Sequence, residues 1–349
     1  MKNVKRWAAL LLLGLSLAGC QRTEGEPTLV ETGMAAVEKG DYQEALSSFD
    51  TAIADGKDLI RAYRGAGMAY MGLGEYEKAV QFFDQALSET KEQQKETRKD
   101  ILYYQAAAFY RWQNYEKTIE TCGKILDISG EGDAFCLTGI CYLKKGDEKA
   151  AQVNFDAAVE ASPEDYDLYL DIYEAYKEEK LSATGDEYLQ KALTIEKDTK
   201  EDAYHKAKIY YYLENYEKAQ EQLAELVGEK DGDALLLMGK IALALEDPVR
   251  SAGLYEQYIA EIGETPEAYN GIALAEIAQE DYDAALAAIQ KGLALEEEQG
   301  KQELYFNEIV AYEQKRDFAT ARAKAEAYVE KYPTDEAGQK EAEFLSTVG

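Results

Sequence analysis

The sequence predicts an all-α fold in which pairs of short helices repeat along the chain and stack into a solenoid. Segments 33–53 and 67–87 align without a gap, with matching residues 34 positions apart. Only 5 of the 349 residues are proline, so long stretches lack the residue that interrupts helices. For a globular chain, this length would suggest two domains. In a repeat protein, length reflects the number of repeats instead, and the internal match leads us to expect such an array.

Residues 1–19 precede the array and have the three parts of a secretory signal peptide. They read MKNVKRWAALLLLGLSLAG: basic residues, then an apolar run, then small residues. The apolar run is shorter than the roughly 20 residues that a membrane-spanning helix needs. We therefore expect a cleaved leader that directs the chain out of the cytoplasm.

The leader ends in a motif that predicts a lipid anchor. Leu17-Ala18-Gly19-Cys20 resembles the lipobox of bacterial lipoproteins, which implies cleavage before Cys20 and a diacylglyceryl group on its thiol. Two acyl chains meet the requirement for stable membrane attachment. The alternative is an ordinary leader with an incidental cysteine. Residues 20–25 then form a short tether, and the protein is expected to be extracytoplasmic and held on a bacterial membrane through this anchor alone.

Residues 26–335 contain the repeats. The matched positions are Gly33/Gly67, Gly40/Gly74, Tyr42/Tyr76, Ala45/Ala79, Phe49/Phe83 and Ala52/Ala86. This period, with a small residue on a first helix, a Gly-Asp-Tyr-like turn and Ala-aromatic-Ala on a second helix, resembles the tetratricopeptide repeat (TPR) family. The resemblance implies a right-handed solenoid of about nine helix-turn-helix repeats. They start near residues 26, 60, 99, 132, 166, 200, 232, 266 and 302.

Three segments depart from the pattern. The turn at 180–184 is degenerate, and Pro248 with Ser251 suggests that the second helix of repeat 7 starts differently. Residues 91–98 lengthen the spacing, which favours longer flanking helices over a hinge or a partner-contact extension. Residues 336–349 are expected to form a cap helix, because the last repeat of such a stack needs a polar covering.

The charge of the chain excludes two classes of partner. Loss of the basic leader residues leaves 35 basic against 68 acidic residues, a net charge of −33. Nucleic-acid binding depends on cationic side chains that replace counterions on phosphates. Attraction to anionic lipid likewise needs basic clusters. We therefore expect neither nucleic acid nor an electrostatic membrane contact.

The sequence predicts no catalytic residue, no metal site and no cofactor. The single histidine, His205, lies within a predicted helix, and no phosphate-binding glycine loop or His/Glu metal spacing is present. The alternative is an enzyme of glycans or peptides that uses two groove carboxylates, since acidic residues are abundant. We interpret these carboxylates as a solvated acidic face.

Three cysteines remain after Cys20. Cys136 and Cys141 are five residues apart on one helix, so they point in different directions and cannot pair. A disulfide between Cys122 and Cys141 is conceivable, but free cysteine is among the most buried residue types. We therefore expect small buried side chains and no intramolecular disulfide.

Tyrosine, with 27 copies, supplies the candidate binding site. Most copies fit the turns and the core stripes of the repeats. The remainder lie on the first helices, one residue away from the core stripe. In the proteins that this chain resembles, that face lines the concave groove. The groove candidates are Tyr103, Tyr104 and Tyr110 in repeat 3, Tyr204, Lys208, Tyr211 and Tyr212 in repeat 6, and Lys240 in repeat 7. Aromatic residues often anchor interfaces. The competing interpretation is that these tyrosines pack between neighbouring first helices.

These features favour a lipid-anchored scaffold or adaptor that binds a protein or an extended peptide. The sequence resembles TPR lipoproteins of envelope assembly, secretion or cell-wall machinery, and no motif assigns it to one of them. It lacks the lysine and asparagine set with which some TPR domains clamp a C-terminal carboxylate, so an internal or extended segment is the expected ligand. A protein that captures a small ligand or free peptide in a closed cavity is a further alternative.

Overall fold

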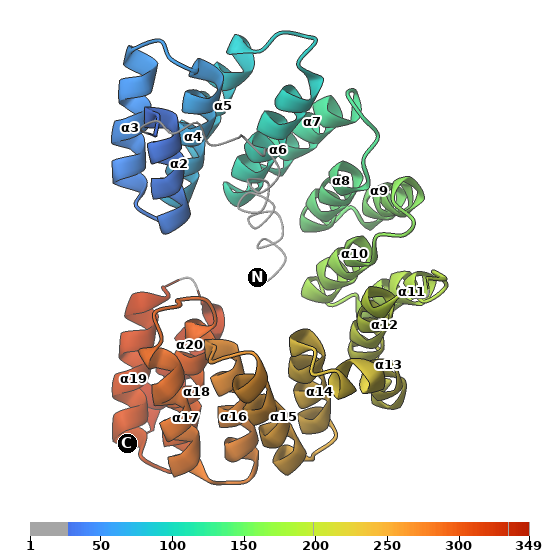
Figure 1. The fold of residues 1–349 in the computed structure, drawn as a ribbon, viewed down its shortest axis with the longest axis vertical. Helices are drawn as coiled ribbons and strands as arrows, with labels where there is room; N and C mark the ends of the chain where they lie inside the picture. The colour runs from blue at the N-terminus through green and yellow to red at the C-terminus, as the bar shows by residue number, and fades with distance from the viewer. Residues whose placement is uncertain (1–26, 198, 334, 349) are drawn as a thin grey trace. The chain divides into compact units, whose positions relative to one another are not determined.

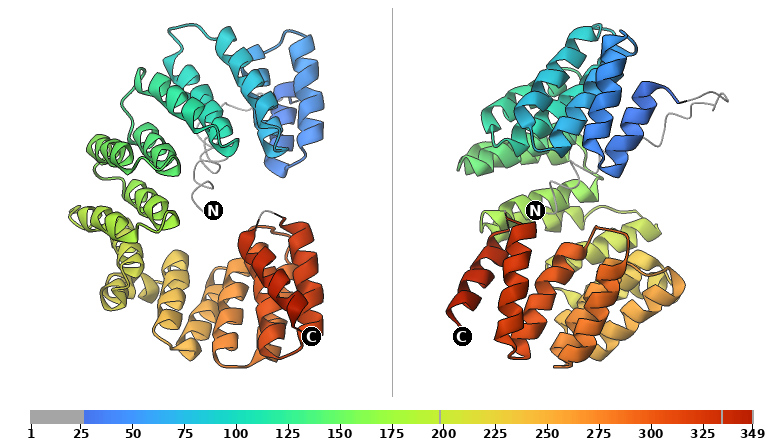
Figure 2. Two further views of the ribbon diagram at one scale, coloured as in Figure 1. Left: turned by 180° about the vertical axis from the view of Figure 1, so that it is seen from behind. Right: turned by 90° about the vertical axis from the view of Figure 1, so that its left-hand side faces the viewer.

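A computed structural model describes residues 27–197, 199–333 and 335–348, and every regular element within these ranges is an α-helix (Figures 1 and 2). The helices form two compact units, one that extends to Ile195 and one that begins at Glu196. Cys20 and the predicted leader lie outside the described residues.

The first unit contains ten helices within the described residues. They are α2 (Leu29–Lys39), α3 (Tyr42–Ala54), α4 (Leu59–Gly72), α5 (Tyr76–Glu89), α6 (Lys95–Arg111), α7 (Tyr115–Leu126), α8 (Gly132–Lys144), α9 (Glu148–Ala161), α10 (Tyr166–Glu178) and α11 (Ser182–Ala192).

The second unit contains nine helices within the described residues. They are α12 (Lys200–Tyr212), α13 (Tyr216–Gly228), α14 (Gly232–Ala244), α15 (Pro248–Glu261), α16 (Pro266–Ala278), α17 (Tyr282–Ala294), α18 (Lys301–Gln314), α19 (Phe318–Lys331) and α20 (Glu336–Thr347).

The helices pack as consecutive pairs. Each even-numbered helix from α2 to α18 packs against the helix that follows it, and within each unit each pair packs against the next. Figure 1 shows the pairs side by side within each unit, with α20 beside the last pair of the second unit. This arrangement confirms the predicted fold class, a TPR-like solenoid, with nine helix-turn-helix repeats and a further helix among the described residues.

The turn inside each pair has one backbone geometry. In all nine turns of the described chain one residue has a positive φ between 56° and 81°. These residues are Gly40, Gly74, Gln113, Gly146, Lys180, Glu214, Glu246, Glu280 and Arg316. Side chains with a Cβ are strained by about 1–2 kcal/mol in this region. Six of the nine turns therefore carry strain that glycine would avoid.

A polar cap follows the residue with positive φ and starts the second helix. Asn114, Asp147, Asn215, Asp281 and Asp317 each accept a hydrogen bond from the backbone N–H three residues later. Such N-caps satisfy an otherwise unpaired donor and contribute about 1 kcal/mol. The turn thus specifies both the reversal of the chain and the first residue of the next helix.

The strained turns predict a gain in stability upon substitution by glycine. Glu280 has a φ of 63° and is exposed, so Glu280→Gly should raise the free energy of unfolding by up to about 1 kcal/mol. Gly74→Ala should lower it by about 1 kcal/mol through the backbone alone, because a Cβ there would meet no atom within 4 Å. Urea unfolding followed by circular dichroism measures both. Shifts of the same sign would contradict the account of the turns.

The core is built from glycines on first helices and aromatic rings on second helices. Phe49 of α3 is fully buried between Gly33 of α2 and Gly65 of α4. A Cβ added at Gly33 would lie 2.6 Å from the Phe49 ring, and one at Gly65 would also collide with it. In the second unit, Tyr255 of α15 lies in the same way between Gly239 and Gly271. Each ring therefore joins its own pair to the next pair.

The segment at 91–98 lengthens only the helix that follows it. Residues 90–94 form a loop, and α6, with 17 residues, is longer than α5, which has 14. Arg98 closes the loop by donating to Thr90 Oγ1 at 2.7 Å. The expectation of longer helices on both sides is thus correct for α6 and wrong for α5.

The two degenerate repeats keep the common turn. Lys180 has a φ of 63° at the turn position where three other repeats have glycine. The expectation that the second helix of repeat 7 starts differently is wrong, because α15 begins at Pro248 directly after the Asp247 cap. Proline suits the first helical position, where no N–H partner is needed. Ser251 is fully buried there and donates to the Gly239 carbonyl at 2.9 Å.

Cys122, Cys136 and Cys141 are buried free thiols. Burial raises the pKa of Cys122 to about 12, and burial together with the neighbouring Cys122 raises the pKa of Cys141. Both therefore act as small apolar side chains in the core between α7 and α8, as expected. The absence of an intramolecular disulfide in the mature protein stays a prediction.

Candidate partner-binding faces on α6 and α12

The predicted binding residues fall into two sets that lie in different units. The α6 face, defined as Tyr103, Tyr104 and Tyr110, belongs to the first unit. The α12 face, defined as Tyr204, Lys208, Tyr211 and Tyr212, belongs to the second unit, as does Lys240 on α14. The two sets therefore form separate candidate faces.

Tyr103 packs toward the following helix pair. Its half-buried ring lies against the cluster that contains Leu102 and Leu137, and its hydroxyl donates to Glu131 Oε2 at 2.7 Å. Burial and the Glu131 carboxylate raise the pKa of Tyr103. Lys99 donates to the other oxygen of Glu131 at 2.6 Å. Burial by itself would raise the pKa of Glu131, but the hydrogen bonds from Lys99 and Tyr103 hold this pKa below its usual value.

Tyr104 packs toward the preceding pair. Its side chain is only 6% exposed, and its ring stacks on Phe83 with centroids 5.8 Å apart. The Arg64 guanidinium lies over the Tyr104 ring, 5.9 Å from the centroid, and pairs with Asp100. Burial raises the pKa of Tyr104 to about 12. Tyr104 is therefore packed in the core against both helices of the preceding pair, Phe83 on α5 and Arg64 on α4.

Tyr110 lies at the other end of the α6 face. Its half-buried ring contacts Tyr115 of α7 with centroids 5.9 Å apart. Burial raises the pKa of Tyr110, so its hydroxyl is neutral at physiological pH. The α6 face thus consists of two half-buried rings, Tyr103 and Tyr110, and one buried ring, Tyr104.

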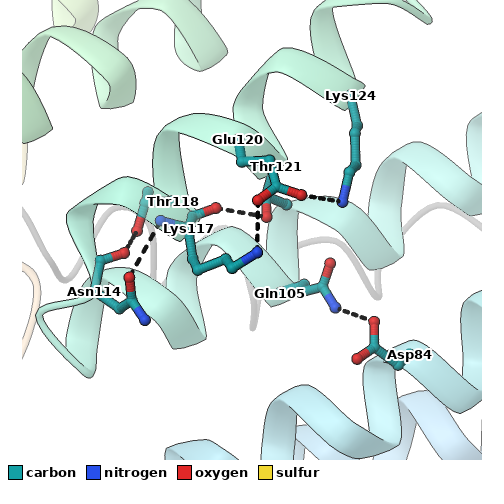
Figure 3. Close-up of polar contacts among 8 residues, drawn as sticks. All are labelled: Asp84, Gln105, Asn114, Lys117, Thr118, Glu120, Thr121 and Lys124. Carbon is teal, nitrogen blue, oxygen red and sulfur yellow. Dashed lines mark hydrogen bonds and ion pairs between the residues drawn. The ribbon is translucent and has the colours of Figure 1, made fainter.

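Polar contacts join α6 to α5 and satisfy buried hydroxyl groups within α7 (Figure 3). Gln105, 3% exposed, donates from Nε2 to Asp84 Oδ1 of α5 at 2.7 Å. On α7, the buried hydroxyls of Thr118 and Thr121 donate to the carbonyls of Asn114 and Lys117 at 3.0 and 2.8 Å. Both hydroxyls are therefore satisfied within the helix, and Thr118 fills the position where most other repeats have alanine, such as Ala45 and Ala79.

The α12 face is more open than the α6 face. All four of its side chains are half-buried. Tyr204 and Tyr211 pack at the margin of the cluster formed by α12, α13, α14 and α15. The Tyr211 ring contacts Tyr212 at 5.7 Å and Tyr216 at 5.9 Å between centroids. Part of each ring stabilises the core, and part reaches the surface.

Two of the predicted binding residues, Lys208 and Lys240, are cationic. Lys240 forms an ion pair with Glu267 of α16, Nζ to Oε1 2.6 Å. Lys206 pairs with the buried Asp202 at 2.8 Å. Lys208 lies half-buried on α12 between Tyr204 and Tyr211 in sequence. Lys240 therefore helps to join two helix pairs, and Lys208 is the lysine that belongs to the α12 face.

Sequence reasoning missed the charged partners of the α6 face. Glu131 and Lys99 come from neighbouring pairs, as do Arg64 and Asp100. The sequence spacing could have revealed these pairs, because ion pairs between successive repeats join residues about one repeat apart. The two pairs here are separated by 32 and 36 residues. Both pairs are part-buried, and they hold the tyrosines in place: Glu131 accepts from Tyr103, and Arg64 lies over the Tyr104 ring.

The described residues contain neither a candidate metal centre nor a membrane-spanning helix. No group of three His, Cys, Asp or Glu side chains gathers there in a metal-binding arrangement, and no helix is both long and apolar enough to cross a bilayer. His205 is half-buried on α12 with its Nδ1 2.8 Å from the Glu201 carbonyl oxygen, as expected for a helical histidine.

A family model of the tetratricopeptide repeat matches residues 30–95, 204–269 and 270–336, which together are more than half of the sequence. The chain belongs to the tetratricopeptide repeat family. Proteins with this fold generally mediate protein–protein interactions and scaffolding, so this TPR protein is a candidate binding scaffold. No curated protein matches it in sequence.

Several solved structures resemble this TPR protein. Yeast Tom70 aligns with a TM-score of 0.55 and 15% identity over 98% of this chain and 83% of its own. A tetratricopeptide repeat protein from Parabacteroides merdae aligns with a TM-score of 0.45 and 17% identity, over 80% and 97% of the two chains. PilF of Pseudomonas aeruginosa aligns with a TM-score of 0.38 and 18% identity, over 62% and 97%. At such identities the likeness to Tom70 shows the fold alone.

Proposed function

We propose that this TPR protein is a lipid-anchored, extracytoplasmic adaptor that binds a protein or an extended peptide in envelope assembly, secretion or cell-wall machinery. The proposal is supported by the combination, in one chain, of the nine TPR helix pairs in the described residues with the sequence Leu17-Ala18-Gly19-Cys20 after a basic and apolar start. The array supplies a binding scaffold, and the anchor keeps that scaffold at the membrane surface.

The face of the first helices supports an extended ligand over a C-terminal carboxylate. The positions that would form a carboxylate clamp hold Arg64 and Met68, Tyr103 and Ala107, or Leu170 and Glu174. Arg64 already pairs with Asp100, and Tyr103 bonds to Glu131. The α12 face offers partly exposed rings instead, which suit the apolar and backbone groups of an extended segment.

The anchor is tested by Cys20→Ser. Loss of the thiol removes the acceptor of the diacylglyceryl group, so we expect the variant to leave the membrane fraction and to lack lipid by mass spectrometry. Cys122→Ala is the matched control, because that cysteine is buried in the array and its loss should leave the protein on the membrane. A Cys20→Ser variant that still carries lipid would refute the anchor.

A further inference from the structure

Two asparagines join the first helices of repeats 8 and 9. Asn307 of α18 donates from Nδ2 to Oδ1 of Asn270 on α16, with 2.7 Å between the two atoms. The two helices pack against each other, and both asparagine side chains are half-buried. The hydrogen bond therefore holds two carboxamide groups side by side at the boundary between two repeats.

The asparagines lie beside the faces of α16 and α18 that build the core. On α16, Gly271 faces the Tyr255 ring of α15, and a Cβ at this glycine would collide with the ring. On α18, Ile309 and Ala311 are fully buried. The carboxamides thus lie at the margin of the core.

Apolar side chains follow the asparagines along both helices. Leu274 and Ile277 come four and seven residues after Asn270, and Val310 comes three residues after Asn307. Residues at these spacings lie on one side of a helix. All three apolar side chains are half-buried. We define the α16–α18 face as these five residues.

The asparagine pair leaves one hydrogen-bond donor and one acceptor for a ligand. Within the described parts of the chain, Asn270 Nδ2 and Asn307 Oδ1 make no further hydrogen bond. Neither atom is among the buried polar atoms without a partner there, so both reach solvent. If both carboxamides were turned over, the pair would still present one donor beside one acceptor.

A donor beside an acceptor matches the main chain of an extended peptide. In an extended segment the N–H and C=O of one residue point to the same side, which is why paired strands exchange two hydrogen bonds at one residue. An apolar side chain of the segment can then contact Leu274 and Val310. Such a ligand uses every group of the α16–α18 face.

The charges around the face favour a basic segment over a carboxylate. The face contains no cation, and the nearby Lys240 of α14 is paired with Glu267 of α16. The chain as a whole has a net charge of −30. Charge complementarity therefore attracts lysine or arginine side chains of a ligand and disfavours its carboxylates.

We propose that the α16–α18 face is a peptide subsite, where Asn270 and Asn307 bind the N–H and C=O of one residue in an extended segment with apolar and basic side chains. This inference rests on the proposed adaptor function, because it names the chemistry of the ligand. It adds a contact to those of the α12 face in the same unit.

Binding of a defined peptide to the purified full chain tests the proposal. The probe is a labelled acetyl-Lys-Val-Lys-Leu-Lys-Val-Lys-amide, which alternates basic and apolar residues and has no terminal carboxylate. Fluorescence anisotropy measures its Kd at about 150 mM salt, where long-range charge attraction is screened. Asn270→Ala and Asn307→Ala should each raise the Kd about threefold to tenfold, as expected for loss of a hydrogen bond.

Asn154→Ala is the matched control. Asn154 lies on α9 in the first unit and donates to the Ala150 carbonyl of its own helix at 2.8 Å. This substitution should leave the Kd of the probe unchanged.

Probes with N-methyl groups separate main-chain recognition from charge attraction. One probe is methylated on the nitrogens of its three apolar residues and another on those of its two inner lysines, so that each lacks the donors on one side of the strand. One of them should bind the unmodified chain several-fold more weakly. The same methylation should have little further effect on the Asn307→Ala variant, because the two changes remove one interaction.

Thermal unfolding of each variant distinguishes binding from a purely structural role. A raised Kd in both asparagine variants, with the chain folded and Asn154→Ala unchanged, supports the subsite. A lower unfolding midpoint with an unchanged Kd would show that the carboxamides only join two repeats and would overturn the proposal. Failure of the probe to bind the unmodified chain would overturn it as well.

The proposed adaptor function has separate readouts. If replacement of Tyr204 and Tyr211 by alanine raises the Kd of the probe whereas the asparagine variants do not, the adaptor function stands and the subsite fails. If the probe does not bind at all, Cys20→Ser still tests the membrane anchor independently.

Discussion

Phe49→Ala is expected to lower the free energy of unfolding by about 3–5 kcal/mol. The Phe49 ring is fully buried and fills the space between glycines of two successive first helices. Its removal leaves a cavity that neither Gly33 nor Gly65 can fill, because glycine has no side chain. Urea unfolding measures the loss, and hydrogen exchange should place it in α2, α3 and α4, since each repeat contacts only its neighbours.

Phe344→Ala is the matched control for this change. Phe344 of α20 is 49% exposed, so its loss should change the free energy of unfolding by about 0.5 kcal/mol or less. A cost below about 1 kcal/mol for Phe49→Ala, or uniform loss of protection across both units, would show that the small-aromatic contact does not join the repeats.

Simultaneous replacement of Tyr204 and Tyr211 by alanine should weaken partner capture by more than ~2 kcal/mol. Both rings are half-buried, so part of each remains accessible to a ligand. Because both also pack at the margin of the core, we expect a moderate loss of stability as well. Equilibrium binding of the captured partner to the purified variant, compared with thermal unfolding, separates the two effects.

Tyr255→Leu is the control, because it should lower the stability of the protein and leave the residues of the α12 face unchanged. Tyr255 is 2% exposed and lies in the same cluster, so this change should lower the unfolding midpoint and leave partner affinity unchanged. If the double variant is destabilised but binds as tightly as the unmodified protein, the tyrosines of α12 belong to the core and the binding site lies elsewhere.

The fold could be predicted because the repeat encodes its own packing. The 34-residue spacing of Gly33/Gly67 and Phe49/Phe83 corresponds to contacts that the structure shows between glycines and aromatic rings. The turns were harder to predict. Lys180 and Glu280 adopt a conformation that favours glycine, because the helices on both sides determine the turn more strongly than its own residue does.

The candidate site was predictable only as a set of residues on helix faces. Helical spacing places Tyr103 and Tyr104 on adjacent stripes, but it does not say that Tyr104 stacks on Phe83 while Tyr103 bonds to Glu131. Those partners come from neighbouring pairs, and the sequence of a single helix carries no record of them. The same holds for Lys240, whose ion pair with Glu267 joins two repeats.

Site-specific photo-crosslinking in the native envelope tests the central claim, that the α12 face binds a protein partner, most directly. A photo-reactive phenylalanine analogue would replace Tyr211 in one variant of the full chain and Val249 in another. Val249, on α15 of the same unit, is 70% exposed and lies outside the α12 face. The account predicts a discrete crosslinked product from position 211 and none from position 249. A product from position 249 with none from position 211 would contradict it.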